Sequence, residues 1–179
     1  MFLNFGIIES KTGKKNMNII VAADKKNGIG YQGRLLVTIP FDQQLFRKET
    51  IGKVVVMGRK TLESLPGGRV LEGRTNIVLT RNQDYMCKGA IVCHSVDEVL
   101  EQIKQYRSED VYVIGGESVY REFLPYANRI HLTRIDYVYV ADTFFPEISA
   151  EEWTLTDVSD EQTYFDLVYD FRCYERKQK

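Results

Sequence analysis

The sequence predicts an α/β protein built on a mainly parallel, twisted sheet with helices on both faces. Short apolar runs over residues 19–23 and 53–57 are typical of strands buried on both sides. Helical segments alternate with such runs, and this alternation implies parallel strands joined by right-handed crossovers. The last two apolar runs, Trp153–Val158 and residues 167–174, alternate around the polar loop SDEQT, so they predict an antiparallel hairpin at the sheet edge.

Length and composition indicate one soluble globular domain in 179 residues. Hydrophobic residues make up 44% and charged residues 27%, which excludes a disordered chain. Lys plus Arg (24) and Asp plus Glu (25) nearly cancel, and a net charge of -1 argues against nucleic-acid or membrane-surface binding. No apolar run approaches a membrane span, and the three cysteines form no C-x-x-C pair or zinc pattern. We expect a cytoplasmic monomer with reduced thiols and no metal, nucleic-acid or membrane partner.

Residues 1–16 differ from the rest of the chain, because they have no clear period and their lysines follow the apolar stretch instead of preceding it, unlike a signal peptide. We interpret them as a leader or extension outside the fold, and residues 17–179 as the domain. Deleting residues 1–16 is therefore expected to leave the melting temperature and the activity nearly unchanged. Thermal unfolding and an activity assay check this, and a large loss of either would show that the leader packs on the domain.

Proline and glycine mark the limits of the first two predicted helices. Pro40 suits the first position of a helix, and the run FDQQLFRKET that follows it ends near Gly52. A second, short helix is predicted over residues 59–65 and stops at the Pro-Gly-Gly run that begins at Pro66. The strand over residues 53–57 lies between these two helices.

A capping box predicts where the third helix begins. Ser95 and Glu98 have the S-x-x-E spacing, and the run VDEVLEQIKQYR follows Ser95. A fourth helix is predicted between the Gly115-Gly116 pair and Pro125. The remaining strands are predicted by short apolar runs over residues 76–80, 90–93, 111–114 and 129–135.

The run from Gly28 to Gly33 matches the G-x-G-x-x-G fingerprint of dinucleotide-binding proteins but lacks its context. The fingerprint requires a helix to start there, and Pro40 would break such a helix. The acidic residue expected about twenty residues further on is also missing, because that region is itself predicted to be helical. Three glycines in six residues favour instead a flexible loop after the first strand and a candidate lid.

Ligands of parallel sheets bind at the carboxyl ends of the strands, so residues that directly follow a predicted strand are the candidates for a binding site. Gly115 and Gly116 start a helix, where exposed N–H groups suit an anion, although an ordinary strand-to-helix turn would look the same. Arginine beside a hydroxyl residue suits a phosphate, although each arginine alone is as typical of a solvated surface. Two such runs follow strands, at Gly58-Arg59-Lys60-Thr61 and Thr80-Arg81. Together these groups predict a site for a dinucleotide with an extra phosphate.

Asp42 is the acidic residue most suited to chemistry. It lies in the first turn of a helix, where an acid usually satisfies the helix dipole. Its apolar neighbours Ile39, Phe41 and Phe46 place it beside an apolar pocket, where its pKa would rise. Such a carboxylate can pair with a cationic heterocycle or pass it a proton.

Other polar residues have weaker signals. Arg74 could bind a substrate carboxylate or be an ordinary loop arginine. Thr133 is a good strand former, and Tyr120 suits a core position. The two histidines, His94 and His131, have no partner by spacing, and we assign neither a role.

Six segments of the chain together form a familiar pattern: VAADKKNGIG, IPFDQQLFRKET, GKVVVMGRKTLESLPGGRVLEGRTNIVLTRN, VYVIGGESVYREFLP, HLTRI and DTFFPE. Their order and spacing are those of dihydrofolate reductases. The chain resembles this family from Met17 to its C-terminus. The resemblance implies NADPH-dependent reduction of 7,8-dihydrofolate to 5,6,7,8-tetrahydrofolate in one-carbon metabolism, by hydride transfer to C6 and protonation at N5. It also implies the family's three-layer α/β fold, with a mostly parallel eight-stranded sheet and the antiparallel C-terminal hairpin.

The resemblance assigns roles to individual residues. Asp42 matches the acid of the pterin pocket, Thr133 the hydroxyl that supports it, and Arg74 the group that binds the glutamate α-carboxylate. Tyr120 matches a catalytic position near the reacting rings. The other substrate-binding matches, which antifolates would share, are apolar: Val21, Ala22, Phe46, Leu65, Leu71 and Ile114. The NADPH-binding matches are Ala23, Ile29, Gly30, Gly58, Arg59, Lys60, Thr61, Leu79, Thr80, Arg81, Gly115, Gly116, Glu117, Ser118, Val119 and Tyr120, with Gly115-Gly116 resembling the family's cis link.

Three alternatives stay open at this point. A related-fold NADPH reductase of riboflavin synthesis would lack the set of Asp42, Thr133 and Arg74. A non-catalytic nucleotide-binding protein would bind NADPH without oxidising it. A resistance-type reductase would bind antifolates weakly. The chain also departs from the family pattern at Val37, where tryptophan is frequent and could position a water molecule.

Overall fold

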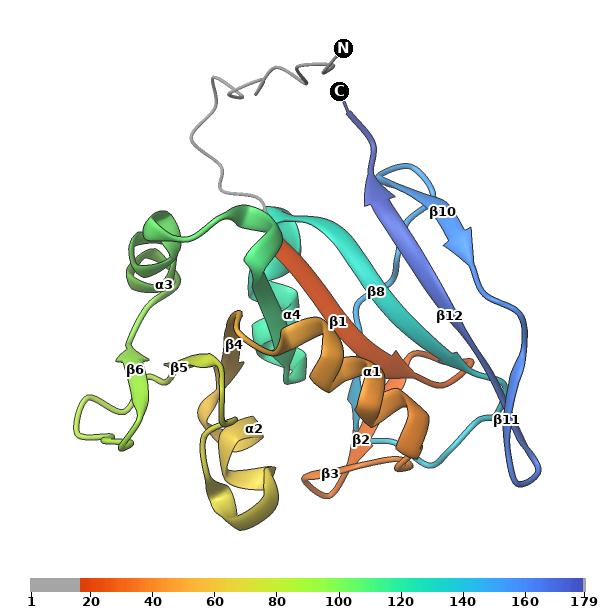
Figure 1. Ribbon diagram of the computed structural model, residues 1–179, viewed down its shortest axis with the longest axis horizontal. Helices are drawn as coiled ribbons and strands as arrows, with labels where there is room; N and C mark the ends of the chain where they lie inside the picture. Colours follow the sequence, from red (N-terminus) through yellow and green to blue (C-terminus); the bar gives the residue numbers. More distant parts are fainter. Residues whose placement is uncertain (1–16, 179) are drawn as a thin grey trace.

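The computed structural model describes residues 17–178, so the predicted leader over residues 1–16 lies outside the described part. A sheet in the order β10-β12-β8-β1-β7-β4-β5-β6 forms the centre of the molecule (Figure 1). Its strands are β1 (Met17–Ala23), β4 (Val54–Gly58), β5 (Thr75–Leu79), β6 (Ala90–Cys93), β7 (Val111–Gly115), β8 (Ala127–Ile135), β10 (Trp153–Val158) and β12 (Leu167–Arg176). The helices are α1 (Pro40–Thr50), α2 (Arg59–Ser64), α3 (Val96–Gln102) and α4 (Glu117–Phe123), with 3₁₀ turns at Pro66–Gly68, Ile103–Gln105, Ser108–Asp110 and Leu124–Tyr126.

Strand directions confirm the predicted fold class. The pairs that join β8, β1, β7, β4, β5 and β6 are all parallel. Strand β12 runs antiparallel to both β8 and β10, and the short β11 (Gln162–Tyr164) pairs with β12. Strand β12 lies between β10 and β8, and β10 and β11 both pair with β12 at this edge.

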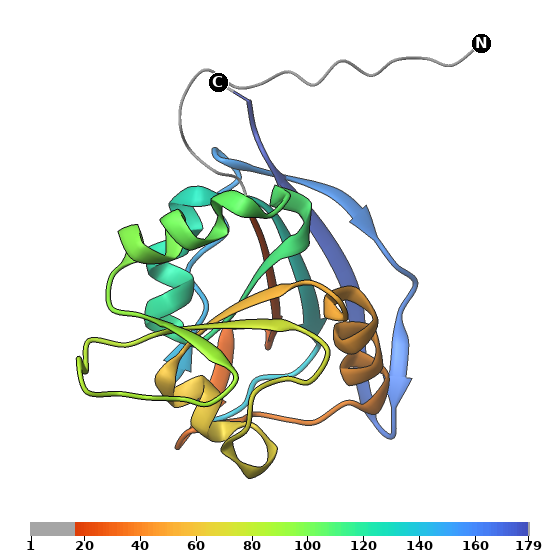
Figure 2. The same ribbon diagram turned by 60° about the vertical axis from the view of Figure 1, so that its left-hand side comes forward.

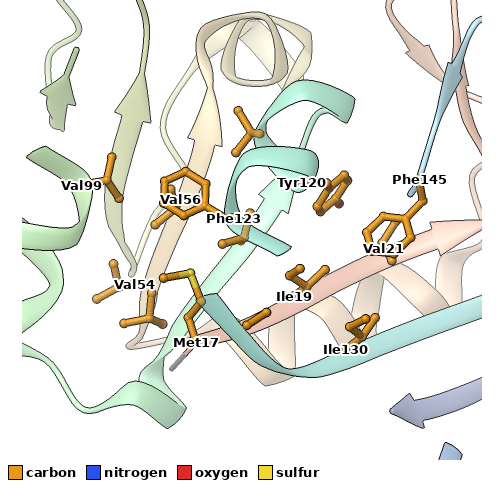
Figure 3. Packing of buried hydrophobic residues seen from close by; sticks show 14 of the residues in the cluster. Met17, Ile19, Val21, Val54, Val56, Val99, Tyr120, Phe123, Ile130 and Phe145 are labelled. Carbon is orange, nitrogen blue, oxygen red and sulfur yellow. The ribbon is translucent and has the colours of Figure 1, made fainter. Parts of the chain in front are cut away.

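Successive side chains along each strand point to opposite faces of the sheet, and both faces bury apolar residues. Helices cover the two faces, so the molecule has three layers. One face packs against α3 and α4, with Ile19, Val113 and Phe123 in a single buried cluster. Figure 3 shows this cluster, in which Phe123 reaches the strands that carry Val54 and Val56. The other face carries Val55 and further buried residues under α2, and α1 lies on the same side. Figure 2 shows α3 and α4 to the left of the sheet and α1 to its right.

The interpretation of Gly28–Gly33 as a flexible loop is wrong. Strand β2 (Gly28–Tyr31) pairs with β3 (Arg34–Leu35) and β9 (Thr143–Phe144) in a second, three-stranded antiparallel sheet. The carboxylate of Asp142 also accepts a hydrogen bond from the backbone N–H of Gln32 at 2.8 Å. The partner strand β9 lies more than one hundred residues away, so no local pattern revealed the pairing.

Helix limits differ slightly from the expected ones. The capping box is present: the Ser95 hydroxyl accepts from the Glu98 N–H at 3.1 Å, and the Glu98 carboxylate accepts from the His94 N–H at 2.7 Å. Helix α3 ends at Gln102 and continues only as the 3₁₀ turn Ile103–Gln105, so it is shorter than the predicted segment.

His131 gives the fold a testable dependence on pH. Its Nε2 atom is buried and has no hydrogen-bond partner among the described residues, and its ring centroid lies 5.9 Å from that of Tyr112. Burial lowers the pKa of His131 below its ordinary value of 6.5, against the opposing effect of Glu49. The unfolded chain therefore takes up this proton more readily, and the free energy of unfolding should fall as the pH drops below about 6.5.

Denaturant unfolding at several pH values between 7 and 5 checks this prediction. The variant His131→Gln should lose less stability over that range than the unsubstituted protein, because it has no imidazole to protonate. Equal losses in the two proteins would show that other groups cause the acid sensitivity.

Candidate active site

A cavity of about 1190 Å³ opens at the carboxyl ends of β1, β4, β5 and β7. Its wall includes all the predicted cofactor-binding residues except Ala23. Ala23 is 1% exposed and belongs to the core, so it does not line the cavity. The substrate-side residues Val21, Ala22 and Ile114 do line it.

Glycines keep one wall of this cavity free of side chains. Gly115 and Gly116 are joined by a cis peptide bond, in agreement with the family resemblance, and Gly115 has a φ of 124°. A Cβ on Gly116 would lie 3.4 Å from Thr61 Oγ1, and a Cβ on Gly58 would lie 3.1 Å from Val119 Cγ2. Gly58, Gly115 and Gly116 all line the cavity, so backbone without side chains faces it where β4 and β7 lead into helices.

Cationic side chains gather in another part of the cavity. Arg59 and Lys60 begin α2, and Arg81 follows β5. Arg59 is 35% exposed and pairs with Glu63 at 2.9 Å, an exposed pair that contributes little to stability. These cations are free to turn toward an anion that enters the cavity.

His94 also lines the cavity, although no role followed from its sequence. Its Nδ1 lies 3.0 Å from the carbonyl oxygen of Thr80. Since a carbonyl only accepts, Nδ1 carries the hydrogen and Nε2 is left for a ligand or water. His94 could have been predicted from its position directly after β6, because Thr80, which was assigned to the site, holds the same position after β5.

Asp42 lies in a small cavity of about 30 Å³ that continues from the large one, since Ala22, Ile29 and Leu35 line both. The Thr133 hydroxyl donates a hydrogen bond of 2.5 Å to Asp42 Oδ1. Burial raises the pKa of Asp42 above its ordinary value, and the bond from Thr133 opposes that rise in part. The carboxyl is therefore held in one orientation and takes up a proton more readily than in water.

Tyr120 forms part of the wall near β1. Its hydroxyl donates to the carbonyl oxygen of Ile20 at 2.8 Å. Its ring packs edge-on against Phe145, with 5.1 Å between the two centroids, and Figure 3 shows the two rings next to each other. Burial raises the pKa of Tyr120 far above its ordinary value, and the charge of Asp42 adds to this effect. The tyrosine thus stays protonated, and its position favours a supporting role over proton transfer.

Five predicted substrate-binding residues line neither cavity: Phe46, Leu65, Leu71, Arg74 and Thr133. Leu65 and Leu71 pack in the cluster of α2 together with Ile114. The guanidinium of Arg74 donates to the Thr50 hydroxyl at 3.2 Å and to the Glu72 carbonyl at 3.0 Å. Thr50 is the last residue of α1, so Arg74 stands at one end of that helix and Asp42 at the other.

Val37, where the family often has tryptophan, lines the small cavity beside Asp42. Within residues 17–178, no group of three or more His, Cys, Asp or Glu side chains could hold a metal ion. In the same part of the chain, no helix is both long and apolar enough to cross a membrane.

Comparison with known proteins gives one consistent result. A family model described as dihydrofolate reductase matches residues 16–176. The dihydrofolate reductase of Staphylococcus haemolyticus is 34% identical over 164 residues, which cover 89% of this chain and 95% of that protein. That of Bacillus subtilis (strain 168) is 36% identical over 165 residues, covering 90% and 95%. The solved dihydrofolate reductase from Enterococcus faecalis, complexed with NADP(H) and RAB-propyl, superimposes with a TM-score of 0.82 at 34% identity and covers 92% of this chain and 98% of that one.

Proposed function

The chain belongs to the dihydrofolate reductase family and catalyses NADPH-dependent reduction of 7,8-dihydrofolate to 5,6,7,8-tetrahydrofolate, and from this premise we propose the roles of its own residues. The observation that carries the proposal is the bond between Thr133 and Asp42 in the small cavity next to the large one. That arrangement puts a held carboxyl at the edge of a cavity large enough for two flat rings to meet beside it.

The large cavity fits NADPH by shape and by charge. The glycine-lined wall at Gly58, Gly115 and Gly116 lets a pyrophosphate approach the backbone closely. The cations Arg59, Lys60 and Arg81 suit the additional phosphate of the adenosine half. Ile29 and Gly30 would then lie beside the nicotinamide, close to the entrance of the small cavity.

The residues around Asp42 prepare the substrate for reduction. Asp42 would hold the pterin by its amide-amidine edge and favour a proton at N5, and its raised pKa makes proton uptake easier. Thr133 fixes the carboxyl orientation through its hydrogen bond. The hydride for C6 would come from NADPH when it is bound in the large cavity. Apolar residues such as Val37, Ile39 and Ile135 line the small cavity and exclude water from the carboxyl. Holding the two reacting rings in near-attack geometry contributes up to about 10 kcal/mol.

Arg74 would bind the α-carboxylate of the substrate's glutamate. Helix α1 separates it from Asp42, and eight residues of helix span about 12 Å. A substrate with a ring at one end and a carboxylate at the other matches this separation. Burial and the nearby charge of Arg47 lower the pKa of Arg74, so a bound carboxylate would relieve repulsion between the two arginines. Antifolates that share this ring and tail are expected to occupy the same positions.

A spectrophotometric assay tests the function directly. NADPH absorbance should decrease when dihydrofolate is added to the protein and should remain constant without it. NADPH binding without oxidation would favour the alternative of a non-catalytic nucleotide-binding protein. The riboflavin-type reductase would instead oxidise NADPH only with its own pyrimidine substrate.

We also propose the domain bounds, the oligomeric state and the cellular location of the protein. Residues 17–179 would form the whole reductase domain, and the match of the family model to residues 16–176 supports this. We expect a monomer, which light scattering during gel filtration would test. Cytoplasmic location is supported by the three cysteines, Cys87, Cys93 and Cys173, which are all free thiols.

A further inference from the structure

Asp24 carries a buried carboxylate that the proposed mechanism does not use. It follows β1 directly, is 1% exposed and lines neither cavity. Among the described residues, no Lys, Arg or His side chain forms an ion pair with it. A buried charge without a cation is costly, so it is retained only where hydrogen bonds to the charge replace water.

Backbone N–H groups from two separate segments supply those hydrogen bonds. Oδ1 accepts from the N–H of Lys26 at 2.9 Å, in the turn between β1 and β2, and from the N–H of Gly28 at 2.8 Å, the first residue of β2. Oδ2 accepts from the N–H of Tyr139 at 2.9 Å, which lies in the connection between β8 and β9. The two oxygens of one carboxylate therefore join segments that are more than one hundred residues apart.

Both segments lead into the walls of the active site. The turn leads to Ile29 and Gly30, and the connection leads to Asp142 and Thr143; all four residues line the large cavity. Figure 1 shows β2 beside the chain that follows β8, in agreement with the pairing of Gly30 with Thr143. A displacement of either segment would therefore move the wall where we place the nicotinamide.

Close packing at Gly28 leaves little freedom in this arrangement. A Cβ on Gly28 would lie 2.9 Å from Asp24 Oδ2 and 2.9 Å from the Cβ of Ala141. The guanidinium of Arg134 adds hydrogen bonds to the carbonyl oxygen of Asp24 at 2.6 Å and to Asn27 Oδ1 at 3.1 Å. The turn and the connection thus meet at the Asp24 carboxylate, and β8 joins them through the Asp24 backbone carbonyl.

We propose that Asp24 is a positioning residue of the reductase: its carboxylate holds the β1–β2 turn and the β8–β9 connection together, and so sets where Ile29, Gly30 and Thr143 stand in the cavity wall. This inference rests on the proposed binding of NADPH in the large cavity. It assigns Asp24 no contact with substrate or cofactor. Its effect on the reaction passes entirely through the backbone of the two segments.

The substitution Asp24→Asn should release the β8–β9 connection from the β1–β2 turn. An amide has only one acceptor oxygen, so its NH₂ group would face the Tyr139 N–H. At a temperature where circular dichroism shows the variant folded, the NADPH dissociation constant should rise and kcat per active site should fall, each about tenfold or more. Amide hydrogen exchange should accelerate at both Gly28 and Tyr139 and stay unchanged in β4 and β5. Gly28→Ala should give the same pattern, because it forces the same elements apart without changing the carboxylate.

Asp136→Asn is the matched control. Asp136 also joins these segments, since it pairs with Lys25 at 2.6 Å, but both side chains of this pair are more than half exposed. Such pairs contribute little, so kcat and the NADPH dissociation constant should stay within twofold of the unsubstituted protein.

The outcome that would overturn the inference is a fall in melting temperature alone. If Asp24→Asn, or Gly28→Ala should the first variant not fold, is less stable but has kcat and NADPH affinity within twofold of the unsubstituted protein, Asp24 serves stability only. Faster exchange confined to Tyr139 would also overturn it. The NADPH dissociation constant of the unsubstituted protein tests the proposed cofactor site. The ratio of the variant's dissociation constant to that value tests the role of Asp24. A failure of the cofactor site is therefore distinguishable from a failure of the inference about Asp24.

Discussion

Asp42→Asn is expected to lower kcat at neutral pH by about two to three orders of magnitude and to leave the NADPH dissociation constant within twofold. The amide preserves the size of the side chain and an acceptor for the Thr133 hydroxyl, so the cavity should keep its shape. It removes the group that favours a proton at N5. Steady-state kinetics with dihydrofolate and a fluorescence titration with NADPH measure the two quantities, and an unchanged kcat would contradict the role of Asp42.

The same substitution should also stabilise the fold. Burial raises the pKa of Asp42 above 3.8, so at neutral pH the charged form is less favourable in the folded protein than in the unfolded chain. Asn carries no charge, and the melting temperature should rise by a few degrees. The loss of activity should diminish as the pH falls, because the solution then supplies the proton more readily.

Asp97→Asn provides the control for the simpler explanation that an acid in the first turn only satisfies the helix dipole. Asp97 occupies the first turn of α3, is exposed and lies outside both cavities. Its replacement should lower stability by about 0.3–1 kcal/mol and leave kcat unchanged. Opposite signs for the two stability changes would show that desolvation of Asp42 outweighs its interaction with the dipole.

The double variant Arg59→Ala with Arg81→Ala should lower the preference for NADPH over NADH by about 100-fold, taken as the ratio of the two kcat/KM values. Each lost charge-assisted hydrogen bond to a phosphate contributes about 1.5–3 kcal/mol, and solvent exposure reduces this. The effect should fall mainly on NADPH, because NADH lacks the extra phosphate. It should also shrink at high ionic strength, where salt screens exposed charges.

Arg69→Ala with Arg107→Ala removes the same total charge outside the two cavities. This control should leave the preference for NADPH unchanged. If the variant with Arg59 and Arg81 replaced also keeps the original ratio, the phosphate binds elsewhere.

Much of the fold was predictable because the relevant signals are local. Two-sided burial makes β1, β4, β5 and β7 nearly continuous apolar runs, and Pro40 and the Ser95 capping box mark helix starts. Parallel strands bring their carboxyl ends to one edge, so residues that follow different strands could be assigned to one site before the fold was known. The cavity lined by Gly115, Arg59 and Arg81 has this origin.

The sequence by itself determined the main strands of the central sheet, the helices and the chemical type of each group at the strand ends, because these depend on neighbours within a few turns of chain. Only the tertiary structure decided that Gly28–Tyr31 is a strand paired with β9, that Ala23 is core, and that Asp24 joins two distant segments. It also decided that Asp42 is desolvated and bonded to Thr133, and that Arg74 is held at the far end of α1. These contacts join residues from 24 positions apart, as in Arg74 and Thr50, to more than one hundred apart, and no local pattern records which of them meet.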